Sequence, residues 1–150
     1  MVHGPRNPPG ADQATAVPRA NILGVGISAL TMQRALEVID SWIAQRQRQY
    51  VCVATVHSVM EAQQDPEFRA ILNRSGLTTP DGMPLVWLSR HLGFRWVERV
   101  YGPDLLLAVA EFGVLRGYRH FFYGGAPGVA ERLAERLQAR FPGIVIVGTY

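Results

Sequence analysis

Two hydrophobic patterns alternate along the chain. Short runs of consecutive apolar residues predict strands covered on both faces, and longer stretches with an apolar residue every three or four positions predict amphipathic helices. The predicted strands span residues 21–27, 50–54, 77–79, 119–123 and 144–147, with a small edge strand at 96–97. The predicted helices span residues 32–46, 58–74, 83–92, 103–115 and 129–141. Because strands that alternate with helices form βαβ units, the sequence predicts an α/β fold with a parallel sheet.

Capping residues mark where some of these helices begin. Thr31 is a suitable N-cap for the helix that starts near Met32. Asp65 and Pro66 interrupt the helical segment 58–74. Asp65 is suited to cap the second half of this segment, and Pro66 is suited to its first helical position. The segment is therefore predicted to contain a break.

The first 20 residues differ in composition from the rest of the chain. They contain four prolines and two glycines, and they lack the apolar core of a signal peptide. Residues 1–20 are therefore predicted to be a disordered leader, and residues 21–150 have the size of one domain. Since the sequence stops directly after a predicted strand, we expect this domain to be incomplete at its C-terminus.

Composition excludes several classes of protein. All fifteen basic residues are arginines, but the net charge is only +3, and no basic run is interleaved with aromatic residues. This argues against a nucleic-acid partner. Cys52 is the single cysteine and lies in an apolar run, which predicts a buried strand residue in a cytoplasmic protein. No apolar run reaches the roughly 18 residues that a membrane span needs.

Polar residues follow the second and third predicted strands, where parallel α/β proteins bind their ligands. Thr55 and His57 come after the second strand, and a hydroxyl and an imidazole there can hydrogen-bond a ligand. The alternative is that Thr55 or Ser58 only caps the next helix. Asp81 follows the third strand and is a candidate general base. Its alternative role is an N-cap for the helix near Met83.

An arginine and a glycine-rich turn suit a ligand that carries phosphate. The planar guanidinium of Arg99 matches a diphosphate, and Asp104 either caps the following helix or holds Arg99 in place. An ordinary surface ion pair is the alternative. Gly124 and Gly125 begin the turn 124–128, which joins a strand to a helix. Backbone N–H groups and a helix N-terminus at such a turn can bind an anion.

Other chemistries have weaker support. Residues 24–29 read G-x-G-x-x-A, the dinucleotide-binding pattern, but the second strand is not followed by the acidic residue that would hold a ribose. A dinucleotide-dependent oxidoreductase is therefore a minor alternative. The four histidines are scattered and no Asp-x-Asp occurs, so neither a metal site nor a cofactor is predicted. The G-x-S-x-G pattern of serine hydrolases is also absent.

Five short motifs, taken in order, resemble the WecG/TagA/CpsF family of glycosyltransferases. The motifs are Thr-x-His at 55–57, Asp-Pro-Glu-Phe-Arg at 65–69, Pro-Asp-Gly at 80–82, Arg-x-x-Gly-x-Asp-Leu at 99–105 and Gly-Gly-x-Pro-Gly-Val-Ala at 124–130. The resemblance covers about residues 21–150. It implies a Rossmann-like parallel sheet with helices on both faces.

The resemblance also implies a reaction. Members transfer a sugar, often N-acetylmannosamine, from a UDP-sugar to a polyprenyl-diphosphate-linked saccharide, with inversion and without a metal, in the synthesis of cell-surface polysaccharides. Asp81 would be the catalytic base, Thr55 would line the pocket, and Arg99 would meet phosphate or the departing UDP. Many members have Asn where this chain has His57, which bears on sugar preference.

The partners follow from the same resemblance. Beside the UDP-sugar and the lipid-linked acceptor, we expect peripheral contact with the inner face of the cell membrane. An exposed sheet edge also favours a homo-oligomer. Family members usually continue past Tyr150, and their further part contributes to the nucleotide site. A non-catalytic module that binds a nucleotide or a phosphosugar is therefore the main alternative from another class.

Overall fold

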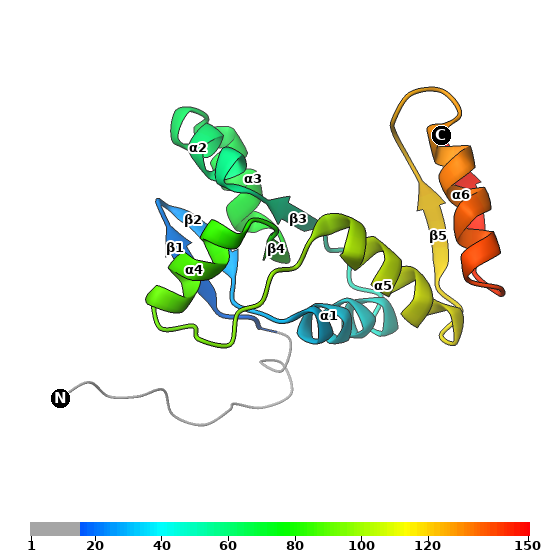
Figure 1. Cartoon of the computed structure of the whole chain (residues 1–150), viewed down its shortest axis with the longest axis horizontal. Coiled ribbons are helices and arrows are strands. Elements are labelled where there is room, and N and C mark those ends of the chain that lie inside the picture. Colours follow the sequence, from blue (N-terminus) through cyan, green and yellow to red (C-terminus); the bar gives the residue numbers. More distant parts are fainter. Residues whose placement is uncertain (1–15) are drawn as a thin grey trace. The chain divides into compact units, whose positions relative to one another are not determined.

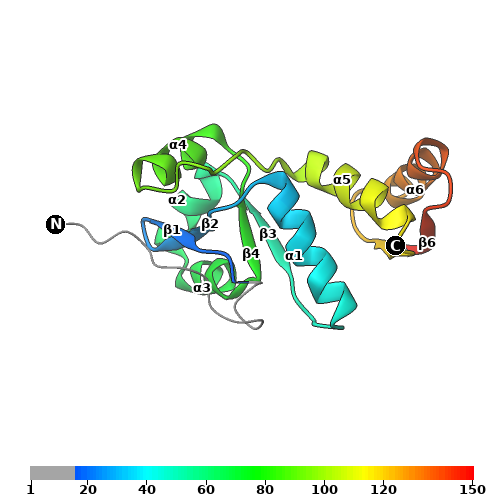
Figure 2. The same cartoon turned by 90° about the horizontal axis from the view of Figure 1, so that it is seen from below.

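The chain is an α/β protein in a computed structural model that describes residues 16–150 (Figures 1 and 2). The predicted fold class is confirmed. The described residues form two compact units, one that ends at Tyr101 and one from Gly102 to Tyr150. No helix within residues 16–150 is long and apolar enough to cross a membrane.

The first unit begins with an antiparallel hairpin. The order of its elements is β1 (Arg19–Ile22), β2 (Val25–Ser28), α1 (Met32–Ala44), β3 (Val51–Ala54), α2 (Val56–Gln64), α3 (Pro66–Arg74), β4 (Leu77–Pro80) and α4 (Met83–His91). Residues 1–15 of the predicted leader lie outside the described residues. The end of that leader is corrected, because Arg19 and Ala20 belong to β1.

The single strand predicted at residues 21–27 is wrong, because the hairpin turn lies inside it. Leu23 and Gly24 have φ angles of 51° and 82°, the left-handed backbone that a two-residue hairpin turn requires. Gly24 is thus a turn residue, and Gly26 lies in β2, paired with Asn21. The glycines of the G-x-G-x-x-A pattern therefore do not open a helix, and the dinucleotide-binding interpretation is wrong.

Strands β3 and β4 pair in parallel, in the register Val51 with Leu77 through Ala54 with Pro80, as the βαβ pattern predicted. Strand β2 lies beside β4, where the Thr78 N–H donates to the Ser28 hydroxyl at 2.9 Å. The main core draws on the hairpin, β3 and three helices: Ile22, Val25, Ile27, Ala54, Val59, Ala62, Leu72 and Leu85.

The prediction that β3 is covered on both faces is wrong for this structure. Val53 is 41% exposed, and Cys52 is half-buried instead of fully buried. Burial still raises the pKa of the Cys52 thiol. The apolar run correctly located the strand, but it did not determine how much of each face is covered.

The caps predicted at Thr31 and Asp65 are confirmed. The Thr31 hydroxyl accepts the Arg34 N–H at 3.2 Å at the start of α1. The Asp65 carboxylate accepts two N–H groups at 2.9 Å at the start of α3, and Pro66 occupies its first turn. Segment 58–74 is accordingly two helices, α2 and α3, separated at Asp65.

The second unit consists of α5 (Gly102–Val114), β5 (Arg119–Phe122), α6 (Val129–Arg140) and β6 (Val145–Thr149). Strands β5 and β6 are parallel, with an irregularity between His120 and Phe121. Its core contains Ala110, Leu137 and Ile144, with partly buried apolar side chains packed around them. The amphipathic pattern of residues 129–141 is confirmed, because Ala130, Ala134 and Leu137 of α6 are buried.

His120 lies in β5 with its ring stacked on Phe122 at 6.2 Å. Burial lowers the pKa of His120 below its ordinary value of 6.5, and its buried Nε2 has no hydrogen-bond partner among the described residues. The folded state therefore disfavours protonation of this imidazole. When the pH falls, the unfolded chain binds a proton at this position before the folded chain does.

We therefore expect His120 to make the fold less stable in acid. The contribution of the neutral His120 imidazole to the free energy of unfolding is fully present above the pKa of the unfolded chain, about 6.5. It is lost as the pH falls through this value, until the folded imidazole also titrates. Urea unfolding on both sides of this pH would measure the loss, and His120→Phe should reduce it. The exposed His91 provides the control variant His91→Phe, which should keep the wild-type decline. An equally steep decline in His120→Phe would contradict the assignment.

Candidate functional site

The carboxyl ends of β3 and β4 form one edge, which we call the β3–β4 edge. Ala54 and Pro80 are paired in the last position of the ladder, and the Asp81 N–H donates to the Ala54 carbonyl at 2.9 Å. Thr55 and Asp81, the next residues along each strand, therefore lie at the same edge. This arrangement is the one that the strand pattern predicted.

Two helices begin at this edge. Helix α2 starts at Val56, and α4 starts at Met83 with Gly82 as its N-cap. The two starts are close together, because a Cβ atom on Gly82 would lie only 4.0 Å from the Val56 nitrogen. Helix N-termini carry partial positive charge and N–H groups without partners in their helix. The β3–β4 edge is thus favourable for an anionic ligand.

Thr55 is the N-cap of α2. Its hydroxyl accepts the Ser58 N–H at 3.3 Å, and the Ser58 hydroxyl accepts the Thr55 N–H at 3.3 Å. The capping role that the sequence allowed is therefore present. Contact between Thr55 and a ligand stays a prediction, since a capping hydroxyl at this edge can also face a bound molecule.

His57 lies in the first turn of α2 on the surface. Its side chain is 88% exposed, and its Nε2 lies 3.8 Å from a carboxylate oxygen of Glu61, one turn further along the helix. The structure therefore places His57 near the edge but pairs it with Glu61. Its predicted contact with a substrate stays a prediction.

Asp81 does not cap α4. The N-cap is Gly82, and no side chain makes a capping bond there, so the capping alternative for Asp81 is wrong. Its side chain is only 13% exposed, and its Oδ1 lies 3.4 Å from Nη2 of Arg99. A mostly buried carboxylate thus lies next to a guanidinium, at an edge where two helices begin.

Arg99 is held from both sides. Its Nε donates to the backbone carbonyl of Asp81, and its guanidinium lies over the Tyr101 ring at 4.5 Å from the centroid. Its backbone is fixed as well, because the next N–H, that of Val100, donates to the Pro80 carbonyl at 2.9 Å. The Arg99 side chain remains 46% exposed. It can therefore contact both Asp81 and a ligand from solvent.

The edge strand predicted at 96–97 is wrong. The segment is not part of a strand, although Val97 is buried and the Glu98 N–H donates to the Leu30 carbonyl at 3.1 Å. The contact between Arg99 and Tyr101 was not foreseen from the sequence. Only their separation by two positions could have indicated it, because side chains two positions apart lie on the same side of an extended segment.

The remaining predicted site residues belong to the second unit. Asp104 lies in the first turn of α5, where a carboxylate is favoured by the helix dipole. Gly124 and Gly125 lie in the loop between β5 and α6, with φ angles of 105° and 89°. Any side chain would be strained at these angles, so the loop requires glycine.

An open hollow of about 280 Å³ lies along this glycine loop. Two exposed aromatic residues stand at its side, since the rings of Tyr123 and Tyr150 stack in parallel with their centroids 5.4 Å apart. The Gly124 N–H donates to the Tyr150 carbonyl at 2.9 Å, which joins the loop to the end of β6. Sequence reasoning missed this tyrosine pair, because the two residues are distant along the chain.

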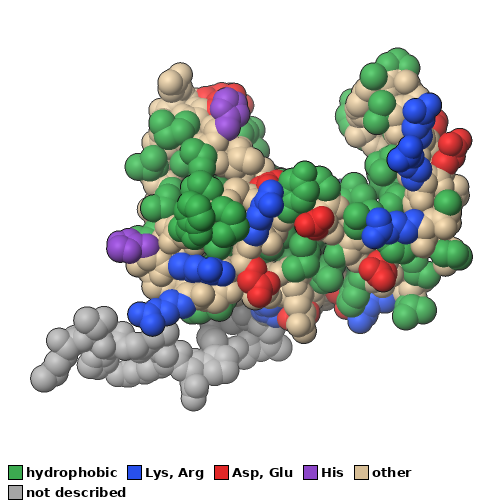
Figure 3. Space-filling view, viewed as in Figure 1, with side chains coloured by type: hydrophobic (Ala, Val, Ile, Leu, Met, Phe, Trp, Pro, Cys, Tyr) green, Lys and Arg blue, Asp and Glu red, His purple; other side chains and the backbone are tan. Residues whose placement is uncertain are grey.

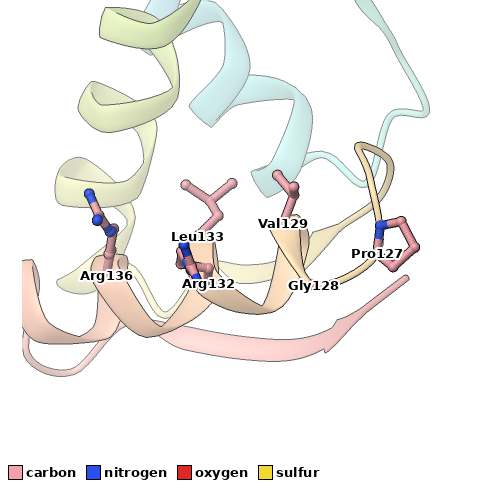
Figure 4. Close-up of a pocket in the computed structure, with 6 residues that line it drawn as sticks. All are labelled: Pro127, Gly128, Val129, Arg132, Leu133 and Arg136. Carbon is pink, nitrogen blue, oxygen red and sulfur yellow. The ribbon is translucent and has the colours of Figure 1, made fainter.

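A second hollow, of about 410 Å³, lies beside the start of α6 (Figure 4). Its lining is Pro127, Gly128, Val129, Arg132, Leu133 and Arg136. Two arginines on one side of a helix give this hollow a positive charge. Within residues 16–150, no group of three or more His, Cys, Asp or Glu side chains converges as metal ligands would.

Comparison with known proteins gives the same result as the residue pattern. Residues 20–150 match the Glycosyl transferase WecG/TagA/CpsF family. An N-acetylglucosaminyldiphosphoundecaprenol N-acetyl-beta-D-mannosaminyltransferase of Bacillus spizizenii is 31% identical over 108 residues, which cover 72% of this chain and 42% of that protein. A protein with the same name from Bacillus subtilis is 26% identical over 87 residues, covering 58% of this chain and 34% of that protein.

The fold is that of an α/β protein in which two helices begin at the carboxyl ends of paired parallel strands. The match over residues 20–150 makes the assignment specific: the chain belongs to the WecG/TagA/CpsF glycosyltransferase family. The resemblance stated from the five motifs is confirmed. The chain spans less than half the length of the curated relatives it matches.

The capping role of Thr55 can be separated from a binding role by mutation. Thr55→Val removes the hydroxyl and should lower the free energy of unfolding by about 1 kcal/mol, whereas Thr55→Ser should keep the cap. Urea unfolding measures both. Thr31→Val is the matched control, because it removes the equivalent cap of α1 and should lower the free energy of unfolding by a similar amount. Unchanged stability in Thr55→Val would mean that the cap contributes nothing.

Proposed function

We propose that this chain provides the acid–base side of an inverting, metal-independent glycosyltransferase. The reaction moves an N-acetylmannosamine-like sugar from a UDP-sugar to a polyprenyl-diphosphate-linked saccharide. The observation that carries the proposal is the pair of Asp81 and Arg99, joined at 3.4 Å on an edge where two helices begin. The names of the two Bacillus relatives, both mannosaminyltransferases, support the choice of sugar and acceptor.

Asp81 acts as the general base in this proposal. Its carboxylate removes the proton of the acceptor hydroxyl while that oxygen attacks the anomeric carbon from the face opposite UDP. The new bond joins this carbon to the acceptor oxygen, and the bond to the UDP oxygen breaks. The proton remains on Asp81, UDP leaves as an anion, and the anomeric configuration inverts. The low exposure of Asp81 keeps bulk water away from the proton transfer.

Arg99 and the two helix starts compensate for the negative charge of the leaving diphosphate. A guanidinium has five N–H donors, so Arg99 can bind phosphate oxygens while Nε and Nη2 contact Asp81. The N–H groups at the starts of α2 and α4 add fixed positive dipoles. Thr55 and His57 are proposed to contact the sugar. The loop of Gly124 and Gly125 in the second unit is proposed to bind an anion by itself, with the Gly125 N–H as donor because the Gly124 N–H already donates to the Tyr150 carbonyl. Asp104 is proposed to support the start of α5.

The role of Asp81 predicts a large loss of turnover on substitution. A general base accelerates a reaction by about 10²–10⁴-fold, so Asp81→Asn should lose that much while remaining folded. Transfer from UDP-N-acetylmannosamine to a lipid-linked acceptor measures it, in this chain and in a form extended to the length of the relatives. Glu98→Gln, an exposed carboxylate next to Arg99, is the control and should retain activity. Full turnover in Asp81→Asn would rule out the base assignment.

The role of Arg99 predicts weaker nucleotide binding. A charge-assisted hydrogen bond contributes about 1.5–3 kcal/mol, so Arg99→Ala should weaken UDP binding by about ten- to a hundredfold. Titration calorimetry measures the change, and Arg95→Ala serves as the matched control from the same segment. Unchanged UDP affinity in Arg99→Ala would remove this residue from the site. UDP binding without any transfer in the extended form would instead favour the nucleotide-binding module.

A further inference from the structure

Helix α4 is apolar on its solvent side as well as on its buried side. Leu85 and Val86 point into the core, while Met83, Trp87 and Leu88 are exposed, Trp87 to 60%. Leu92, just after the helix, and Leu23, in the hairpin turn, are exposed too. We call these five exposed residues, Leu23, Met83, Trp87, Leu88 and Leu92, the α4 face. Figure 3 shows apolar side chains gathered in one area over α4.

The α4 face is concave in one place. A hollow of about 350 Å³ lies between the hairpin turn and the end of α4, and its lining is mostly apolar: Asn21, Ile22, Leu23, Leu88, His91 and Leu92. The surface of a soluble protein rarely leaves apolar side chains grouped in this way, because their contact with water raises the free energy. Such a group marks a surface that binds a partner.

The charged residues within the segment that carries α4 are all basic. Residues 82–97 contain no aspartate or glutamate. They contain two arginines, Arg90 and Arg95, which are both exposed, and the exposed His91. A second exposed tryptophan, Trp96, lies in the same segment. Tryptophan and arginine at the border of an apolar helix surface are typical of segments that lie in the interface of a bilayer.

We propose that the α4 face docks on the surface of an anionic phospholipid bilayer. The apolar side chains would enter the boundary between headgroups and acyl chains, and Arg90 and Arg95 would meet lipid phosphates. This proposal rests on the proposed function for its purpose, since the acceptor of that reaction is anchored in a membrane. Helix α4 starts at Met83, two residues after Asp81, so docking places the β3–β4 edge close to the headgroups.

Sedimentation with vesicles tests the proposal. The chain is mixed with vesicles of phosphatidylcholine, or of equal parts phosphatidylcholine and phosphatidylglycerol. The wild-type chain should bind the vesicles that contain phosphatidylglycerol more tightly than those of phosphatidylcholine alone. The double variant Trp87→Ser, Leu88→Ser should lose about tenfold or more of this binding, because both side chains leave water on docking. Leu115→Ser is the matched control, an apolar residue of the second unit that is 96% exposed, and should bind like wild type.

The electrostatic part has its own variant. Arg95→Gln should lower binding to the anionic vesicles about fivefold and leave binding to neutral vesicles unchanged. Quenching of tryptophan fluorescence by brominated lipids provides a second measurement, and Trp87→Phe should remove most of it. Full vesicle binding by the double variant would overturn the proposal. A wild-type dimer that the double variant abolishes, without vesicle binding, would also overturn it and assign the face to a second copy.

The two proposals can fail separately. Transfer to a short-chain, water-soluble acceptor reports on the chemistry without a membrane. If Asp81→Asn retains this transfer while the α4 face still binds vesicles, the proposed function fails and the docking surface stands. If transfer depends on Asp81 but vesicle binding is the same in wild type and the double variant, the docking surface fails and the proposed function stands.

Discussion

The parallel pairing of β3 with β4 is the interaction on which the candidate site depends. Each strand has four residues, and the N–H of Asp81 extends the ladder by one more bond, to the carbonyl of Ala54. A shift of one residue would separate Thr55 from Asp81 and reverse the side chains of the strand. Because α2 and α4 start directly after these strands, the same pairing also brings two helix N-termini together.

Long-range contacts then organise the side chains at that edge. Arg99 reaches Asp81 from 18 positions further along the chain, and its backbone is fixed by the bond from Val100 to Pro80. The ring of Tyr101 supports the guanidinium on its other side. The carboxylate of Asp81 can therefore be mostly buried at low cost, since its charge is balanced within the site. The same helix that begins beside Asp81 exposes apolar side chains to solvent, which connects the proposed chemistry to a surface for lipid.

Local chemistry explains what the sequence could and could not predict. Caps such as Thr31 and Asp65 act within four residues, so their roles could be read directly. The hairpin at Leu23 and Gly24 was missed because apolar residues continue across the turn and hide it. The partnership of Asp81 with Arg99 depends on how distant segments meet, and spacing alone carries no information about it. The family motifs named both residues without showing that they touch.

The most direct test of the account is hydrogen–deuterium exchange of the chain with and without UDP-N-acetylmannosamine. The backbone amides of residues 55–58, 81–83 and 99–101 belong to the β3–β4 edge and the segment that holds Arg99. The account predicts that exchange slows at these amides when the ligand is bound. Measurable binding that leaves all of these amides unprotected would contradict it, because the ligand would then occupy another part of the protein.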